Sequence, residues 1–308
     1  MAFEVERDAC QWINRDEVLK HFAVYAGSTQ SAKHIKPLHW YIACRLVVEG
    51  GFDPDDITPR PPFKVKVVKG WRLLEYVPGA GKGGERSILG GLKTKKVDVV
   101  VNKNGIGPVL AISCKGVTGA LRNLTNRMEE TIGECTNLHI TYNALVVGYL
   151  AIIRANPFEW ANGGEARLEK NDVVIGPNGR PVSTIVRFDA ALRQLTGRQG
   201  IRNDVSRYES IGLGLVDVVE GHVGELLDTF PEPASPLHFE RFFETLYRRY
   251  DERYVLSAPD LASVTRRHIW DEESRAFADG NGGPELDYEP RVTTGAEDDA
   301  EIDDLTEA

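Results

Sequence analysis

Two apolar runs, each containing one charged residue, constrain the fold most strongly. The first extends from Lys96 to Val101 and the second from Pro108 to Lys115. Runs this rich in Val and Ile are typical of β-strands that are buried on both faces. A carboxylate or an ammonium group within such a strand is costly unless it is paired or binds a metal. Asp98 and Lys115 therefore indicate a hydrolytic metal site on two neighbouring strands.

Composition indicates an ordinary globular protein. The 308 residues allow one large domain or two modest ones, and 42% are hydrophobic and 27% charged. The sequence contains neither an apolar run of about 20 residues nor the basic-then-apolar start of a signal peptide. The four cysteines show no Cys-x-x-Cys spacing, which favours reduced thiols in a cytosol over disulfides or a zinc site.

The distribution of charge matters more than its sum. A formal net charge of −9 argues at first against a nucleic-acid partner, but residues 296–308 hold seven acids and no base. Without those seven acids the rest of the chain carries −2. We expect residues 296–308 to be a disordered acidic tail. It either improves solubility or competes with DNA for a basic cleft.

The order of predicted elements gives the fold class. We expect helices at 15–26, 37–49, 119–135, 188–196 and 237–250, and strands at 64–68, 96–102, 108–115, 144–153, 183–188 and 211–219. A short connection containing glycine joins strands 96–102 and 108–115, which predicts an antiparallel hairpin. Residues 78–84 are rich in glycine and are expected to form a flexible flap, because the P-loop spacing is absent. The sequence thus predicts an α/β (α+β) fold with a central mixed β-sheet flanked by helices.

Strand geometry predicts which side chains meet. Side chains alternate between faces, so Ser113 and Lys115 share one face while Cys114 points to the other and offers its carbonyl at the edge of the site. If the hairpin pairs as expected, Asp98 and Lys115 converge at one end of the sheet.

A magnesium site needs a second carboxylate, because Mg²⁺ takes hard oxygen ligands. The helix at 119–135 offers Glu129, Glu130 and Glu134. On a helical wheel, Glu129 lies at the border of an apolar stripe centred on Met128, and the other two lie on the far side. We therefore expect Glu129 to reach the sheet; whether Glu129 or Glu130 completes the site stays open.

This pattern resembles the PD-(D/E)xK nuclease superfamily over residues 96–130. The family carries an acid on one strand and an acid-x-Lys triplet on the next; here Asp98 and Lys115 match, Ser113 replaces the second acid and Val97 replaces the proline. Type II restriction endonucleases that cut CCGG-like sites carry the same Ser-x-Lys and take the missing carboxylate from the following helix. That carboxylate lies fourteen residues after the lysine, the position of Glu129 here.

The resemblance implies a function. The expected activity is Mg²⁺-dependent hydrolysis of phosphodiester bonds in double-stranded DNA, with Asp98, Lys115, Glu129 and Ser113 as catalytic residues. Asp98, Glu129 and the Cys114 carbonyl would hold the metal, and Lys115 would orient or help deprotonate water. The family's base-contacting arginine corresponds to Arg122, but its preceding aspartate is Leu121 here, so the CCGG target does not carry over.

Basic and amide side chains near the site are the expected DNA contacts. They are Lys93, Lys95, Lys96, Arg122, Asn123, Asn126 and Arg127. Glu49 and Glu85 are candidate supporting acids for a second metal. We expect a single domain over residues 1–295, with a catalytic core at about 37–155 and a C-terminal elaboration at about 156–295. Residues 90–139 also resemble uncharacterised bacterial restriction-like proteins.

The restriction interpretation predicts further partners. We expect a homodimer on palindromic DNA, a cognate methyltransferase, and a bacterial cytoplasmic protein that defends against foreign DNA while its substrate lies at the nucleoid. Two alternatives stay open. One is a structure-specific or defence-system nuclease that needs a partner, and the other is a catalytically inert DNA-binding protein with the same fold.

Overall fold

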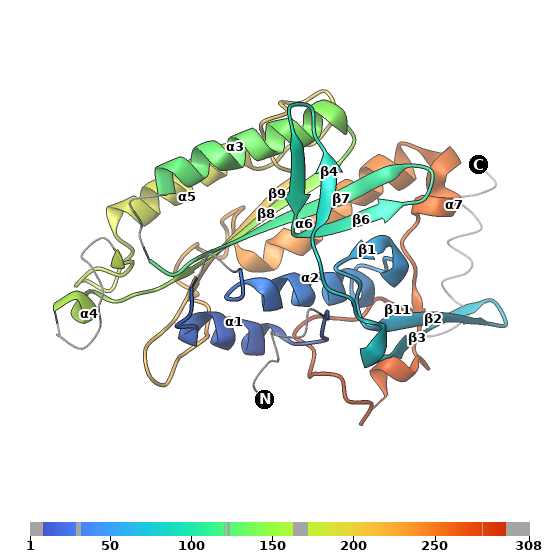
Figure 1. Ribbon diagram of the computed structural model, residues 1–308, viewed down its shortest axis with the longest axis horizontal. Coiled ribbons are helices and arrows are strands. Elements are labelled where there is room, and N and C mark those ends of the chain that lie inside the picture. Colours follow the sequence, from blue (N-terminus) through green and yellow to red (C-terminus); the bar gives the residue numbers. More distant parts are fainter. Residues whose placement is uncertain are drawn as a thin grey trace.

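The fold is built on a five-stranded mixed sheet with the order β1-β6-β7-β8-β9 (Figure 1). The computed structural model describes residues 9–28, 32–119, 121, 124–162, 172–278 and 280–293. Strands β1, β6 and β7 are antiparallel, whereas β7, β8 and β9 are parallel. The five strands are β1 (Ile57–Thr58), β6 (Val99–Lys103), β7 (Gly107–Val117), β8 (Val146–Arg154) and β9 (Ser210–Val216).

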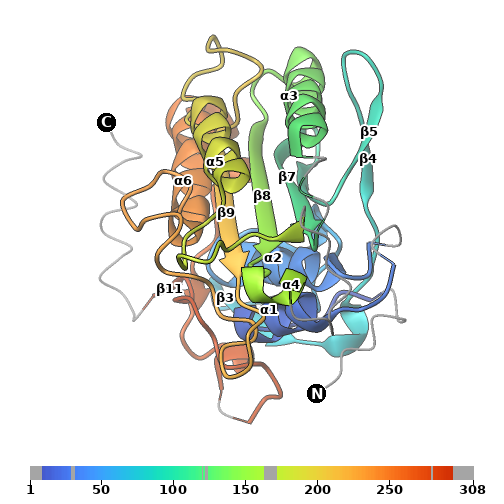
Figure 2. The same ribbon diagram turned by 90° about the vertical axis from the view of Figure 1, so that its left-hand side faces the viewer.

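Helices cover both faces of this sheet, as Figures 1 and 2 show. Helices α1 (Arg15–Val24), α2 (Lys36–Val48) and α6 (Phe239–Asp251) form one apolar core with the sheet. Helices α3 (Leu124–Thr141) and α5 (Ser183–Leu195) form a second core on the opposite face. Both faces are buried, which explains why β6 to β9 are nearly continuous apolar runs. The predicted fold class is confirmed.

Three small ribbons and several short helices complete the structure. The ribbons pair β2 (Phe63–Val68) with β3 (Trp71–Tyr76), β4 (Arg86–Leu89) with β5 (Thr94–Val97), and β10 (Trp270–Asp271) with β11 (Val292–Thr293). The short α-helices are α4 (Phe158–Asn162) and α7 (Ala262–Thr265), and a π-helical turn (Glu252–Leu256) extends α6. The β4-β5 hairpin lies beside α3 (Figure 2).

The structure differs from the predicted elements in two places. Residues 183–188, predicted as a strand, form the start of α5, because Ile185, Phe188 and Leu192 recur at helical spacing on its buried face. The strand predicted over 96–102 is interrupted at Asp98, so its first half pairs with β4 and its second half with β7. The predicted hairpin of 96–102 and 108–115 is otherwise confirmed, and the helix predicted from 119 is described from Leu124 and continues to Thr141.

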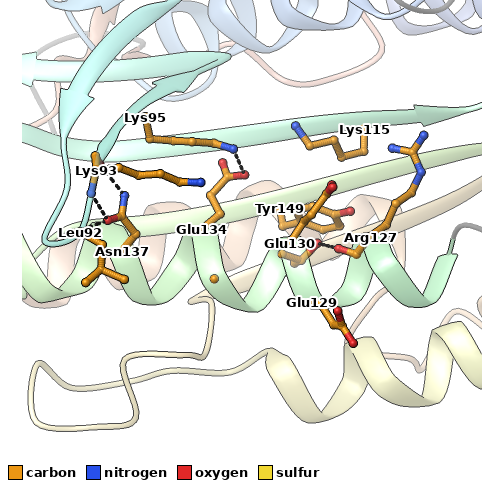
Figure 3. A pocket seen from close by; sticks show the side chains of 12 residues that line it. Leu92, Lys93, Lys95, Lys115, Arg127, Glu129, Glu130, Glu134, Asn137 and Tyr149 are labelled. Carbon is orange, nitrogen blue, oxygen red and sulfur yellow. Dashed lines mark hydrogen bonds and ion pairs between the residues drawn. The ribbon is translucent and has the colours of Figure 1, made fainter.

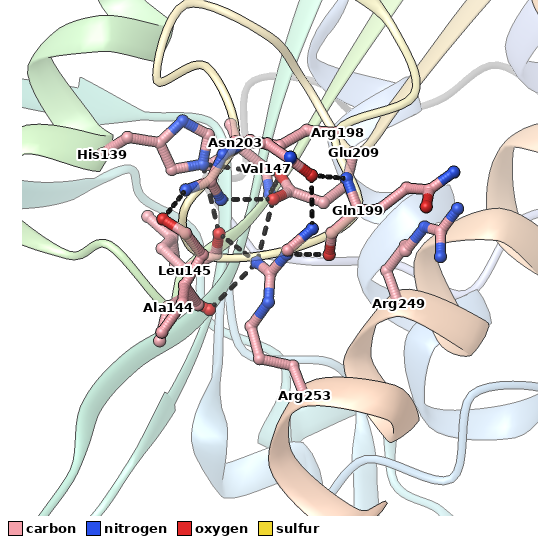
Figure 4. Close-up of polar contacts among 12 residues, drawn as sticks. His139, Ala144, Leu145, Val147, Arg198, Gln199, Asn203, Glu209, Arg249 and Arg253 are labelled. Carbon is pink, nitrogen blue, oxygen red and sulfur yellow. Dashed lines mark hydrogen bonds and ion pairs between the residues drawn. The ribbon is translucent and has the colours of Figure 1, made fainter. Parts of the chain in front are cut away.

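A buried charged network joins the N-terminal ends of β8 and β9 to the loop after α5 (Figure 4). Glu209 accepts hydrogen bonds from Arg198 at 2.7 Å and Arg253 at 2.8 Å. Its second oxygen accepts the Val147 N–H at 2.7 Å and lies 3.5 Å from the His139 Nε2. Burial alone would raise the pKa of the Glu209 carboxyl, but these partners lower the pKa below its ordinary value.

Replacing Glu209 with Gln should destabilise the fold by about 3–5 kcal/mol, because two arginines would lose their buried counter-charge. The lowered pKa means that this stabilisation is present at neutral pH and is lost as the pH falls below about 4. Urea unfolding between neutral pH and pH 3 measures both effects. E220Q, at an exposed glutamate, is the matched control. Equal stability of E209Q and E220Q would show that the network contributes nothing.

Candidate functional site

The break between β5 and β6 positions Asp98. One carboxylate oxygen of Asp98, Oδ2, accepts the backbone N–H of Cys114 on β7 at 2.7 Å. The same oxygen lies 3.8 Å from the Lys115 Nζ. The predicted convergence of Asp98 and Lys115 is therefore confirmed. Because a backbone N–H holds the carboxylate, its position does not depend on a flexible side-chain partner.

Two carboxylates act on Lys115. Burial lowers its pKa, but the surrounding groups, chiefly Asp98 and Glu134, outweigh burial and raise the pKa above its ordinary value. The ammonium group is therefore fully protonated at neutral pH. In this state Lys115 can donate hydrogen bonds but cannot accept a proton.

The carboxylate that α3 brings to the sheet belongs to Glu134. The Ser113 hydroxyl donates a hydrogen bond to the Glu134 Oε1, and the Lys95 Nζ lies 2.9 Å from its Oε2. Only 4% of the Glu134 side chain is exposed. Glu129, in contrast, borders the same cavity but is exposed, and it points to the side of α3 away from Lys115 (Figure 3). The expectation that Glu129 reaches the sheet is wrong.

The reason is the orientation of α3. Ile132 lies one turn after Met128 and so belongs to a stripe centred there, but its side chain is 38% exposed, whereas the polar Thr131 is 3% exposed. Tyr208 donates a hydrogen bond to the Thr131 carbonyl and helps to fix this face inward. The buried face is thus rotated by about 60° from Met128, toward Glu134 and away from Glu129. Glu130 lies one turn before Glu134, on the cavity side of the helix (Figure 3).

His39 is not among the residues that the sequence pattern singled out. Helix α2 places the His39 Nε2 3.8 Å from the Asp98 Oδ1. That nitrogen is buried without a hydrogen-bond partner, and burial lowers the pKa of the imidazole despite the nearby Asp98. His39, Asp98 and the Cys114 thiol have ligand atoms within 4.8 Å of one another. No sequence-local signal links His39 to Asp98, because the sheet brings them together.

The two supporting acids have different surroundings. Glu85 lies close enough for its charge to act on His39, and it faces Lys96 at 3.9 Å. Glu49 binds Arg45 through both oxygens, at 2.7 and 2.8 Å, and accepts the Tyr247 hydroxyl. Glu49 therefore serves a structural ion pair, so a metal role for it is not favoured by its contacts.

A cavity of about 610 Å³ lies between the β4-β5 hairpin and α3 (Figure 3). Four basic and three acidic side chains line it: Lys93, Lys95, Lys115 and Arg127, with Glu129, Glu130 and Glu134. Lys96 and Asn126 are exposed and are not part of the cavity lining. Arg122, Asn123 and the acidic tail at 296–308 lie outside the described residues. Of the predicted DNA contacts, Lys93, Lys95 and Arg127 thus line the cavity together with Lys115.

Asn137 attaches the hairpin tip to α3. Its side-chain oxygen accepts the N–H groups of Leu92 at 2.7 Å and Lys93 at 3.1 Å, and its amide donates to the Lys93 carbonyl at 2.9 Å. A Cβ on Gly90 would lie 2.0 Å from this amide, so the close approach requires glycine there. Asn137 therefore holds Lys93 and Lys95 over the cavity.

Comparisons with known proteins identify no relative. Neither a protein-family model, a curated protein nor a solved structure matches this chain. Within the described ranges, no helix has both the length and the apolar character needed to cross a bilayer. The function must therefore be argued from the geometry of the site.

Replacing Asn137 with Ala should release the hairpin tip, since three hydrogen bonds disappear at once. We expect a loss of about 1–3 kcal/mol in the free energy of unfolding and faster hydrogen exchange at the Leu92 and Lys93 amides. Exchange followed by mass spectrometry, with N126A as the exposed control on the same helix, measures this. Unchanged exchange at the tip would contradict the role given to Asn137.

Proposed function

We propose that this chain is a divalent-metal-dependent nuclease that hydrolyses phosphodiester bonds in double-stranded DNA. The observation that carries the proposal is the 3.8 Å approach of Asp98 and Lys115, with Glu134 of α3 bound by Ser113 on the same strand and acting electrostatically on Lys115. Ser113 stands where the resembled family has an acid, and it binds the Glu134 carboxylate. Helix α3 thus supplies the carboxylate that β7 lacks at position 113.

The residues present fit a divalent cation. Asp98 offers a carboxylate 3.8 Å from the His39 Nε2, which is buried without a hydrogen-bond partner, and Glu134 is the candidate for a second carboxylate from α3. A bound cation would lower the pKa of water and neutralise charge on the phosphate. Magnesium favours oxygen ligands alone, whereas manganese also accepts imidazole. The His39 position therefore supports Mn²⁺ as well as the Mg²⁺ expected from the sequence, and the neutral imidazole is the form that binds metals.

Lys115 acts as a hydrogen-bond donor in this proposal. Because its pKa is raised, it stays charged at neutral pH. It would orient the attacking water or contact a non-bridging phosphate oxygen, and its charge would stabilise the transition state. Of the two roles expected for Lys115, a charged ammonium group therefore favours orienting the water over deprotonating it.

The cavity supports DNA as the substrate. Lys93, Lys95 and Arg127 present positive charge beside Lys115, and lysines typically contact phosphates. A type II restriction enzyme, with a homodimer and a cognate methyltransferase in a bacterial cytoplasm, is the specific form of this proposal. An inert DNA-binding protein would use the same cavity without cleaving.

Replacing Asp98 with Asn or Glu134 with Gln should reduce cleavage of unmethylated phage DNA in Mn²⁺ or Mg²⁺ by at least about a hundredfold, because each loses a metal ligand charge. E129Q is the matched control on α3 and should cleave like the wild type. Gel assays with EDTA as the negative control measure this. The assignment fails if E129Q loses activity while E134Q keeps it. Binding of DNA without cleavage by the wild type would favour the inert alternative.

Replacing His39 with Gln should weaken the binding of Mn²⁺ more than the binding of Mg²⁺, because imidazole is a better ligand for Mn²⁺. The wild-type protein with Mn²⁺ should show nitrogen coupling by pulsed electron paramagnetic resonance, and H39Q should lose it. H34Q, at another buried histidine, is the control. Absence of nitrogen coupling in the wild type would exclude His39 as a ligand even if H39Q failed to fold.

A further inference from the structure

The direction of Lys95 follows from the pairing of its hairpin. Lys95 pairs across the ribbon with Ile88, and Val97 lies two residues further along the same face. Ile88 and Val97 are 3% and 1% exposed and belong to the core that contains α3. The side chain of Lys95 therefore points toward α3 rather than outward, as its exposed neighbours Thr94 and Lys96 do.

Lys95 forms an ion pair with Glu134, whose carboxylate the proposed metal site needs. The Lys95 Nζ lies 2.9 Å from the Glu134 Oε2 (Figure 3), while the Glu134 Oε1 accepts the Ser113 hydroxyl. Both oxygens of Glu134 are thus engaged. A second cation at the same oxygen would be repelled by the ammonium group, because like charges at contact distance in a partly buried site interact strongly.

Lys95 also has an alternative anion within reach. Its side chain is 31% exposed and lines the 610 Å³ cavity together with Lys93, Lys115 and Arg127. Glutamates line the cavity as well, so a phosphate that enters it would bind where these four cations lie. Phosphate oxygens accept hydrogen bonds from lysine as carboxylates do, so Lys95 can exchange Glu134 for a phosphate without losing its counter-charge.

We propose that Lys95 is a positioning residue that couples DNA binding to metal binding. Without DNA, its ammonium group neutralises Glu134 in place of a metal ion. When a DNA phosphate binds in the cavity, Lys95 moves to the phosphate and Glu134 becomes available to the metal. DNA and the metal ion then each increase the affinity of the protein for the other, as thermodynamic linkage requires. This inference rests on the proposed nuclease function. It adds that DNA binds before the metal ion, because the site takes up metal most readily when its substrate is bound.

The experiment measures Mn²⁺ affinity from the free-ion signal in electron paramagnetic resonance, with and without a short phosphorothioate duplex that resists hydrolysis. For the wild type we expect the duplex to increase Mn²⁺ affinity. For K95M, which keeps the apolar stem but not the charge, we expect about tenfold tighter Mn²⁺ binding without DNA, the size of one charged contact in a partly exposed place. The duplex should then increase Mn²⁺ affinity in K95M much less than in the wild type.

Two further variants make the result specific. K64M removes an exposed lysine from the separate β2-β3 ribbon, outside the cavity lining, and it should keep the wild-type coupling. K95R keeps the charge and should restore the coupling. The inference is overturned if K95M binds Mn²⁺ no more tightly than the wild type, or if the duplex strengthens Mn²⁺ binding equally in both. A wild type that binds neither Mn²⁺ nor the duplex would overturn the proposed function itself.

Discussion

The hydrogen bond from the Cys114 N–H to the Asp98 carboxylate is the constraint on which the rest of the site depends. It uses a side chain where a continuous strand would use a backbone carbonyl. The chain can therefore leave β5, which belongs to a separate hairpin, and enter β6, which belongs to the central sheet. One residue thus fixes the strand break, the position of its own carboxylate and the distance to Lys115. The cost of a charge among buried valines is offset by that bond and by Lys115.

The second carboxylate depends on a small residue. Ser113 is short enough to leave space between β7 and α3, and its hydroxyl donates to Glu134. A strand acid at this position would place two carboxylates in the same buried volume, where like charges oppose ionisation of both. A serine at position 113 is therefore what allows Glu134 to lie there as a buried carboxylate. Lys95 balances the charge of Glu134 from a third element, and the hairpin attachment at Asn137 helps to keep it there.

The sequence predicted the parts of the site that follow strand periodicity. That Ser113 and Lys115 share one face, and that Asp98 and Lys115 converge, could be predicted because strand geometry leaves little freedom. The choice among Glu129, Glu130 and Glu134 could not, because a helix turns by about 100° per residue and one exposed Ile132 shifts the inferred face. His39 was beyond reach, since it meets Asp98 only through packing of α2 on the sheet. The error at 183–188 has the same origin, because a short apolar run suits a strand or a buried helix equally.

The most direct test of the account is anomalous diffraction from crystals of the wild-type protein soaked in Mn²⁺ together with a phosphorothioate duplex. The account predicts an anomalous peak within coordination distance of Asp98 and Glu134, with Lys95 turned from Glu134 to a phosphate. A peak on Glu129 instead, or duplex bound in the cavity without any metal at Asp98, would contradict it.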